Sequence, residues 1–245
     1  MSRPETTRRE GVLRWHRERT RWLSSGWRGG YEAAPAAYNV TVPEGWSERD
    51  LDGYLRERLD RAGFAADGPA LLTGVSVSNA RAARCGPATA VATAGLSNPA
   101  ELPVEGGGPA DPSREPCGGS HGPRDDGPGR PGTVNLLVYS ARALTDGALA
   151  SLLALVAEAK AATLLATAGV PGTTSDAAVV GCPRAGPPAA FAGSATEVGA
   201  CARACVREAV RAALDARYPD GDRPRGMDEA RYGVRTDRRA EVFEP

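Results

Sequence analysis

Apolar positions recur along this chain with two different periods, which divide it into strands and helices. Between Val12 and Ser24 apolar and charged residues alternate, and this period of two predicts one or two half-buried strands. Residues 133–140 form an almost continuous apolar run, which is typical of a strand covered on both faces. Shorter apolar runs predict further strands at residues 38–42, 70–78, 88–96 and 177–181.

Three segments show the helical period instead. The first follows Ser47, a suitable N-cap with Asp50 at the capping-box position, and it ends at Gly63. The second runs from residue 145 or 146 to about 167, and the third from about 195 to 218. Strands and helices in this order predict a single α/β domain whose mixed β-sheet is covered by helices. A parallel sheet and a layered α-β-β-α arrangement are both compatible with the pattern.

Two stretches fall outside the periodic pattern. Residues 105–131 consist mostly of Gly, Pro, Asp, Arg and Ser, which predicts a disordered surface insertion. Cys117 and His121 lie within it, four positions apart, and because no second pair of ligands is nearby we expect no metal site. Beyond about residue 219 the chain is a charged tail marked by Gly and Pro, with at most a weak strand near its end.

Composition limits the classes of partner and the cellular compartment that we expect for this chain. The 30 basic and 30 acidic side chains balance, so net charge gives no reason to expect nucleic acid or an anionic membrane as partner. The five cysteines form no C-x-x-C pair and the N-terminus lacks an apolar run, which favours a reducing cytoplasm. The most apolar segment carries Glu158 and Lys160 near its middle, and it is therefore predicted to be a soluble helix rather than a membrane span.

Lys160 is the only lysine in a chain rich in arginine and alanine. At helical spacing it shares the apolar stripe of Leu149, Val156 and Leu164, whereas Glu158 lies about 200° away around the helix. A lysine on an apolar stripe either extends to the edge of the helix or points into a polar site. The sequence leaves both interpretations open.

Three loops carry polar groups suited to binding or catalysis. The segment LSSGWRGG, with Ser25 and Gly26, is either a plain glycine turn or a place where backbone approaches a ligand. Ser97 and Asn98 directly follow the strand predicted at 88–96, at the end of a sheet where ligands often bind. The turn PGTTSD either satisfies its own hydroxyls or presents them to an oxyanion. Its polar side chains are Thr173, Thr174, Ser175 and Asp176.

Four motifs, in this order along the chain, resemble the adenosylcobinamide amidohydrolase family. They are TAGLSNPA at 93–100, GTVN at 132–135, EAKA at 158–161 and GTTSDAAVV at 172–180. LSSGWRGG at 23–30 and YNVTV at 38–42 also resemble the opening of that family. Apart from the insertion and the tail, the resemblance covers most of the chain.

The resemblance implies hydrolysis of the amide that joins the aminopropanol arm to the corrin ring of adenosylcobinamide, giving adenosylcobyric acid for cobamide salvage. The substrate is fringed with amides, which need both donors and acceptors, so we expect it to be bound by polar groups of the resembling segments. These are Ser25, Gly26, Asn39, Ser97, Asn98 and Asn135. The expected partner is this corrinoid alone, and no cofactor is expected because the substrate itself carries the cobalt. The oligomeric state is left open.

The resemblance also leaves two routes of catalysis open. The chain has only two histidines, His16 and His121, and neither lies in a resembling motif, so a Ser–His–Asp triad is not expected. In the first route a hydroxyl attacks the amide carbonyl, with Lys160 as base and N–H groups of the threonine turn as oxyanion donors. The candidate hydroxyls are those of Thr173, Thr174 and Ser97.

In the second route Asp176 or Glu158 activates a water, while Lys160 or an asparagine polarises the carbonyl. Two other functions are also compatible with the sequence. One is a corrinoid-binding protein without hydrolase activity, and the other is an amidohydrolase that acts on a different amide.

Overall fold

The computed structural model describes residues 3–43, 46, 49–64, 67–104 and 132–245. The insertion predicted at 105–131, with Cys117 and His121, lies outside the described residues. The helices are α1 (Leu51–Arg61), α2 (Asp146–Ala168) and α3 (Glu197–Arg217), with a short 3-10 helix at Val77–Asn79. The strands are β1 (Glu5–Arg9), β2 (Val12–Ser24), β3 (Gly30–Thr41), β4 (Ala70–Thr73), β5 (Arg81–Cys85), β6 (Ala88–Ala94), β7 (Pro99–Glu101), β8 (Val134–Ser140), β9 (Ala143–Leu144), β10 (Gly172–Thr173), β11 (Ala177–Pro183), β12 (Pro188–Ala189) and β13 (Val234–Arg235).

Eight strands form one mixed sheet in the order β4-β3-β2-β11-β8-β6-β5, with β1 also paired to β2. The β3–β4 and β8–β11 pairs are parallel, and the other pairs are antiparallel. The chain crosses from β8 to β11 through α2, as a parallel pair requires. The mixed sheet that the sequence predicts is therefore confirmed.

This sheet is folded over on itself, and the fold line crosses β2. β3 pairs with the whole of β2 along one edge, while β1 and β11 share the other edge, opposite residues 12–16 and 20–24 respectively. Between these halves the register shifts, and Arg19 has a left-handed φ of 54°. The first half of β2 thus belongs to one layer of sheet and the second half to the other.

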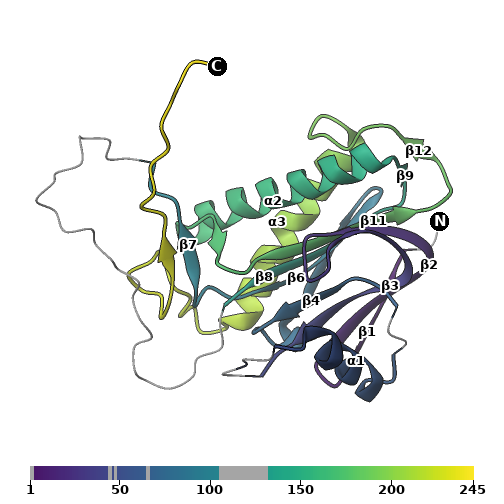
Figure 1. Cartoon of the computed structure of the whole chain (residues 1–245), viewed down its shortest axis with the longest axis horizontal. Coiled ribbons are helices and arrows are strands. Elements are labelled where there is room, and N and C mark those ends of the chain that lie inside the picture. Colours follow the sequence, from purple (N-terminus) through teal and green to yellow (C-terminus); the bar gives the residue numbers. More distant parts are fainter. Residues whose placement is uncertain (1–2, 44–45, 47–48, 65–66, 105–131) are drawn as a thin grey trace, which may run out of the picture.

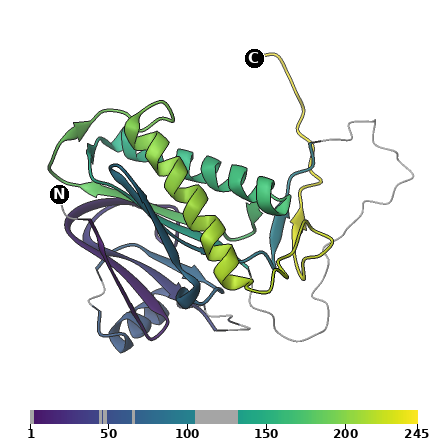
Figure 2. The same ribbon diagram turned by 180° about the vertical axis from the view of Figure 1, so that it is seen from behind.

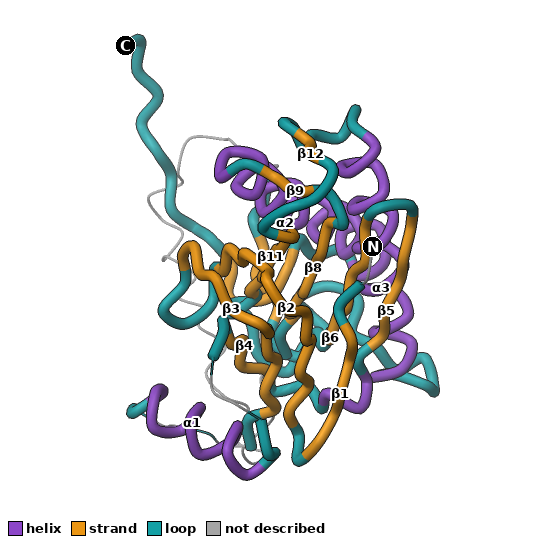
Figure 3. Tube along the Cα trace, turned by 90° about the vertical axis from the view of Figure 1, so that its right-hand side faces the viewer, coloured by secondary structure: helices purple, strands orange, loops and turns teal. Residues whose placement is uncertain are grey.

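Three separate apolar clusters show four layers, α-β-β-α. The first lies between α1 and the outer face of β3 and β4. The second joins the facing sides of the two sheet layers, and the third lies between β6, β8 and β11 and the two long helices. Figures 1 and 3 show α1 on the opposite side of the strands from α2 and α3. Figure 2 shows α3 lying diagonally across the strands with α2 beside it. Of the two arrangements compatible with the sequence, the layered one is found.

Aromatic rings hold the two sheet layers together. Trp15 and Trp22 of β2 and Tyr139 of β8 are fully buried, with their ring centroids 6.1–6.2 Å apart. Rings at such distances and tilted angles add to the stabilisation that burial provides. The middle of the molecule is therefore closely packed, and polar groups can reach solvent only toward its edges.

The two long helices start and stop where the sequence predicts. α2 begins after Thr145, whose hydroxyl accepts a hydrogen bond from Ala148 N, and ends at Gly169 with a φ of 72°. It has a mean hydropathy of 1.7, which is apolar enough for a membrane span, but it packs in the core against the sheet and α3. It is thus a core helix, and cytoplasmic location remains a prediction.

Other predicted bounds are wrong. The N-cap of α1 is Asp50, whose carboxylate accepts from Gly53 N at 2.9 Å, and Ser47 lies outside the described residues. The strand expected at 70–78 stops at Thr73, because the Thr73 hydroxyl accepts from Val75 N and turns the chain into a 3-10 helix. The strand expected at 38–42 is only the end of the twelve-residue β3, and β1 and β5 were not predicted.

The charged tail adds a strand to a second, small sheet. β13 pairs in parallel with β7, and β10 pairs with the other edge of β7. Just before β13, Tyr232 N donates to Ser97 O at 2.9 Å. Figure 1 shows this small sheet at the end of α2, apart from the main sheet. The tail therefore packs beside the loop that carries Ser97 and Asn98.

Candidate active site

The long helix α2 brings Lys160 to the turn that precedes β11. Its ammonium forms an ion pair with Asp176, and only 16% of the lysine side chain and 11% of the aspartate side chain are exposed. The pair lies at the amino ends of the parallel strands β8 and β11, beside the carboxyl end of the antiparallel β6. Lys160 lies on the buried stripe of α2 as predicted, and its head group reaches a polar site at the edge of the sheet.

The Asp176 carboxylate accepts four hydrogen bonds. They come from Lys160 Nζ, from the hydroxyl and the N–H of Thr173 (3.0 Å for the N–H), and from Val134 N at 2.8 Å. A carboxylate offers about four lone-pair positions, so these donors occupy its accepting capacity. Asp176 is therefore an anchor that fixes β8, α2 and the threonine turn to one another.

Gly172 is required by the close approach of the ion pair. A Cβ on this residue would lie 2.6 Å from Asp176 Oδ2 and 2.7 Å from Lys160 Nζ. Atoms this close would force the Asp176 carboxylate or the Lys160 ammonium to shift, and the carboxylate is held by three further hydrogen bonds. The motif GTTSD thus needs its glycine to let Lys160 reach Asp176. We refer to Lys160, Thr173 and Asp176 as the edge cluster.

Ser97 and Asn98 lie next to the edge cluster. Thr174 N donates to Asn98 O at 3.1 Å, and the Asn98 side-chain amide donates to the Thr174 hydroxyl. β7 and β10 continue this contact, with Pro99 opposite Thr173. Thr174 is exposed and Thr173 is nearly buried, at 7%. The structure therefore brings together the two loops that the sequence predicts to form the site.

Two of the predicted substrate-binding asparagines lie inside the molecule. Asn39 of β3 and Asn135 of β8 are 3% and 1% exposed, and Asn135 Nδ2 donates to Asn39 Oδ1 at 3.0 Å. Asn39 Nδ2 donates in turn to the hydroxyl of Thr93 in β6 at 2.9 Å, and Asn135 Nδ2 also donates to Leu72 O at 2.8 Å. We call Asn39, Thr93 and Asn135 the interior cluster. It ties the two sheet layers together.

Thr133 connects the two clusters. Its hydroxyl lies 3.0 Å from Ser175 O and 3.5 Å from Asn135 Oδ1. The next residue, Val134, donates its N–H to Asp176. The segment 133–135 therefore carries a continuous hydrogen-bonded path from the edge cluster to the middle of the molecule. Thr133 was not among the predicted site residues, although it stands inside the resembling motif GTVN.

Ser25 borders the site, and Gly26 makes a tight contact beside it. Ser25 N donates to Ala178 O at 2.9 Å and its hydroxyl accepts from Ala178 N at 3.0 Å, two residues from Asp176. A Cβ on Gly26 would lie 2.6 Å from a methyl carbon of Leu71. The LSSGWRGG segment forms the turn between β2 and β3, and its close approach is to β4 of the same chain.

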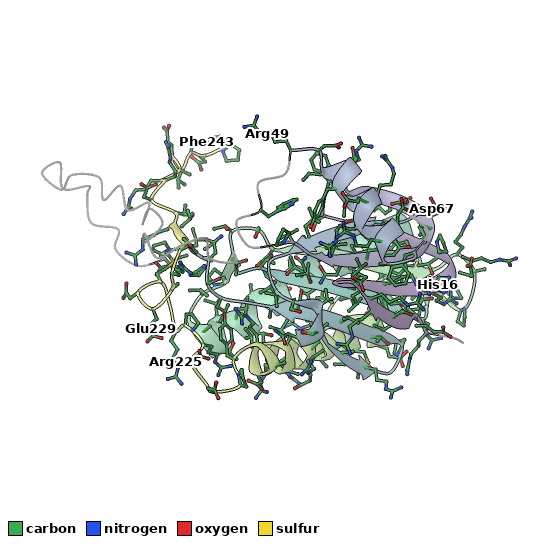
Figure 4. The ribbon with its side chains drawn as sticks, turned by 90° about the horizontal axis from the view of Figure 1, so that it is seen from below. His16, Arg49, Asp67, Arg225, Glu229 and Phe243 are labelled. Atoms are coloured by element: carbon green, nitrogen blue, oxygen red, sulfur yellow. The ribbon has the colours of Figure 1, made fainter. Side chains whose placement is uncertain are left out.

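Glu158 and His16 point elsewhere. Glu158 pairs with Arg203 of α3, on the face of α2 that lies away from Lys160. His16 contacts Glu18 at 3.2 Å. Figure 4 shows His16 at the opposite end of the molecule from Arg225 and Glu229 of the tail segment, which packs against the end of α2 through Gly226 N and Ala168 O. The structure thus brings neither residue to the edge cluster.

The comparisons with known proteins point to one family. The sequence pattern described as adenosylcobinamide amidohydrolase matches residues 1–221. The chain belongs to the adenosylcobinamide amidohydrolase family. A protein of Halobacterium salinarum named adenosylcobinamide amidohydrolase is 52% identical over 245 residues, which cover 98% of this chain and 99% of that protein. A protein of the same name from Methanosarcina mazei is 25% identical over 80% of this chain and 90% of its own length.

Among solved structures, a Burkholderia sp. beta-aminopeptidase is similar at a TM-score of 0.42 and 14% identity, over 88% of this chain and 82% of that one. This similarity is too low to support an inference about fold or chemistry. In this member of the adenosylcobinamide amidohydrolase family, both clusters lie within the matched residues, whereas Tyr232 and β13 lie beyond them. Among the described residues no group of three or more His, Cys, Asp or Glu side chains could hold a metal ion.

Proposed function

We propose that the chain hydrolyses the amide bond between the aminopropanol arm and the corrin ring of adenosylcobinamide, and that the edge cluster performs the reaction. The observation that supports this activity is the 52% identity, over nearly the whole of both chains, to a protein named for it. The products would be adenosylcobyric acid and aminopropanol.

Lys160 is proposed as the group that stabilises negative charge on the carbonyl oxygen. Its ammonium has three N–H donors, and among the described residues it bonds to Asp176 alone. The remaining donors are free for the substrate oxygen. Because Lys160 donates to a carboxylate, we assign it the role of hydrogen-bond donor and not that of base. In the hydroxyl route the base is then Asp176. The N–H groups of Thr173 and Thr174 already donate to Asp176 and to Asn98 O, so they are not free to form the oxyanion site.

Thr173 is proposed as the attacking hydroxyl. It donates to Asp176, and this is the arrangement of a nucleophile beside its proton acceptor. In the first step Thr173 Oγ1 would bond to the carbonyl carbon while its proton moves to Asp176, and Lys160 would hold the resulting oxyanion. The C–N bond would then break as the aminopropanol nitrogen takes that proton. Water would finally hydrolyse the ester on Thr173, returning the hydroxyl.

The route through a water activated by Asp176 has less support. All four accepting positions of Asp176 are occupied by protein donors, and a water would have to displace one of them. The route through Glu158 would need a carboxylate that instead faces Arg203. Ser25, Ser97 and Asn98 are proposed to bind the amide fringe of the corrinoid, because they border the edge cluster.

The first experiment incubates the purified protein with adenosylcobinamide and detects adenosylcobyric acid by mass spectrometry. We expect product with the native chain. Binding without product would instead support a corrinoid-binding protein, and neither binding nor product would support an amidohydrolase of another amide.

Thr173→Val and Thr174→Val form a matched pair, because each removes one hydroxyl and keeps the shape of the side chain. We expect Thr173→Val to lower kcat at least a hundredfold and Thr174→Val to lower it less than tenfold. Quenching the native reaction early should trap a corrinoid ester on Thr173, visible in the intact mass. A fully active Thr173→Val variant would rule out the hydroxyl route and favour attack by water.

A further inference from the structure

Two thiols that the proposed reaction does not use lie in contact with each other. Cys85 is the last residue of β5, and Cys201 lies in the second turn of α3. Their Sγ atoms are 3.1 Å apart, both cysteines are free, and both are half-buried. We call them the thiol pair. Its members are 116 positions apart in sequence, so the fold itself brings them together.

The β5–β6 turn is shaped to admit the Cys201 side chain. The turn follows Cys85 directly, and Gly86 has a left-handed φ of 45°. A Cβ on Gly86 would lie 2.9 Å from Cys201 Sγ. A larger residue would therefore be strained and would push the thiol away. The contact between the two sulfurs thus depends on this glycine.

A surface cavity opens beside the thiol pair. Its volume is about 600 Å³, and it is lined by Arg3, Gly86, Pro87, Ala141, Arg142 and Glu197. Gly86 belongs both to the wall of this cavity and to the contact with Cys201, so the cavity lies one residue away from the pair. Arg142 pairs with Glu197 at 3.1 Å, and Arg3 donates to Gly86 O at 2.9 Å. With Glu197 counted against Arg3 and Arg142, the lining keeps a positive charge, which favours a reagent that carries carboxylates.

We propose that the thiol pair is a site of reversible disulfide formation, oxidised by a carboxylate-bearing low-molecular-weight disulfide that enters through this cavity. One protein thiolate attacks the reagent, forms a mixed disulfide and releases one small thiolate. The second protein thiolate attacks the protein sulfur of that mixed disulfide and releases the other small thiolate. The protein loses two electrons and two protons, and the reagent becomes two thiols. A disulfide needs its sulfurs about 2.05 Å apart, so a shift of about 1 Å closes the bond.

Protonation makes this exchange slow near neutral pH. Burial, followed by the neighbouring Cys85 and then Glu197, raises the pKa of Cys201 to about 11. Because only the thiolate reacts, the exchange should accelerate as the pH rises toward that value. Cys205, one turn further along α3, is buried, and its pKa is raised to about 12, mainly by burial. Its thiol donates to Ala88 O at 3.6 Å.

The test uses the full chain in a Cys117→Ser background, because Cys117 lies outside the described residues. Oxidised glutathione is added to the folded protein at pH 8 and at pH 9, and the product is digested without reduction. We expect a peptide that links Cys85 to Cys201, formed faster at pH 9 and reversed by dithiothreitol. The thermal midpoint should rise by about 5–10 °C, because the bond closes a long loop in the unfolded chain.

Three variants control this experiment. Cys85→Ser and Cys201→Ser should abolish the linked peptide, whereas Cys182→Ser should leave it unchanged, since Cys182 is fully buried elsewhere. Glutathione adducts that never resolve into the linked peptide would overturn the proposal, and so would its absence at both pH values. A linked product that melts below the reduced protein would also overturn it, because the bond would then have formed from a distorted state.

Discussion

The edge cluster and the interior cluster differ in exposure and charge, although the segments that resemble the family supply both. The edge cluster holds an ion pair whose side chains are 16% and 11% exposed, and it joins a helix to a turn. The interior cluster holds neutral amides that are at most 3% exposed, and it joins two layers of sheet. Residue types that are rare in this chain thus occur in both clusters, lysine in the edge cluster and asparagine in the interior cluster. Only the exposed fraction of the side chains shows which cluster a substrate can reach.

The largest expected effect is in the edge cluster. Lys160→Ala and Asp176→Ala should each lower turnover at least a hundredfold, because the first removes the proposed oxyanion donor and the second releases every group that Asp176 holds. Circular dichroism should show that each variant keeps its fold. If the two residues act as a unit, the double variant should be little slower than the slower single variant.

Glu158→Gln is the matched control, since it changes a carboxylate two residues from Lys160 that faces Arg203. We expect kcat within about twofold of the native value. Near-normal rates in a folded Lys160→Ala or Asp176→Ala variant, or a hundredfold loss in Glu158→Gln, would reverse the assignment of roles.

A smaller loss should follow from Gly172→Ala. The added methyl group would stand 2.6 Å from Asp176 Oδ2 and 2.7 Å from Lys160 Nζ, so at least one of the two charged groups must leave its position. We expect kcat to fall at least tenfold. Gly147→Ala in the first turn of α2 is the control, because a Cβ there meets nothing within 4 Å. Equal activity in the two variants would mean that the reaction does not depend on contact between Lys160 and Asp176.

The smallest effect on turnover should come from the interior cluster. Asn135→Ala leaves Asn39 Oδ1 and Leu72 O without their donor, which costs roughly 2–4 kcal/mol of unfolding free energy. The thermal midpoint should fall, while KM for adenosylcobinamide stays within about threefold. A large rise in KM with an unchanged midpoint would instead place Asn135 in contact with the substrate, as the sequence predicted.

Helices and strands that bury a regular apolar stripe could be predicted from the sequence. Strands that are held only by hydrogen bonds to a neighbouring strand could not. The α2 and α3 helices start and end close to their predicted bounds because their caps, Thr145 and Thr196, and their stripes are visible. β1 reads ETTRR and β5 reads RAARC, and neither shows an apolar face. Their partners hold them in place, β1 through the two-residue turn at Glu10 and Gly11.

The candidate site likewise has features that the sequence predicts and features that depend on how the elements pack. The sequence predicted Lys160, Thr173 and Asp176 as members, but the ion pair between them depends on how α2 is positioned against β10, which no local pattern encodes. Glu158 entered the prediction through the motif EAKA, and a rotation of about 200° around the helix carries it to α3 instead. The folding of the sheet across β2 had no visible signal, and for that reason Asn39 and Asn135 were expected to bind the substrate.

The fold line in β2 has a tryptophan on either side, so intrinsic fluorescence reports on the contact between the two sheet layers. Trp15 and Trp22 lie on opposite sides of the fold line in the same strand, and both rings pack against Tyr139 of β8. Indole emission moves to longer wavelengths when water reaches the ring. Trp27 is already 46% exposed, and Trp46 is half-buried against Tyr54, so the largest part of the shift on unfolding should come from the fully buried pair. Parting of the two sheets can therefore be followed by intrinsic fluorescence while the helices, read by circular dichroism, are still formed.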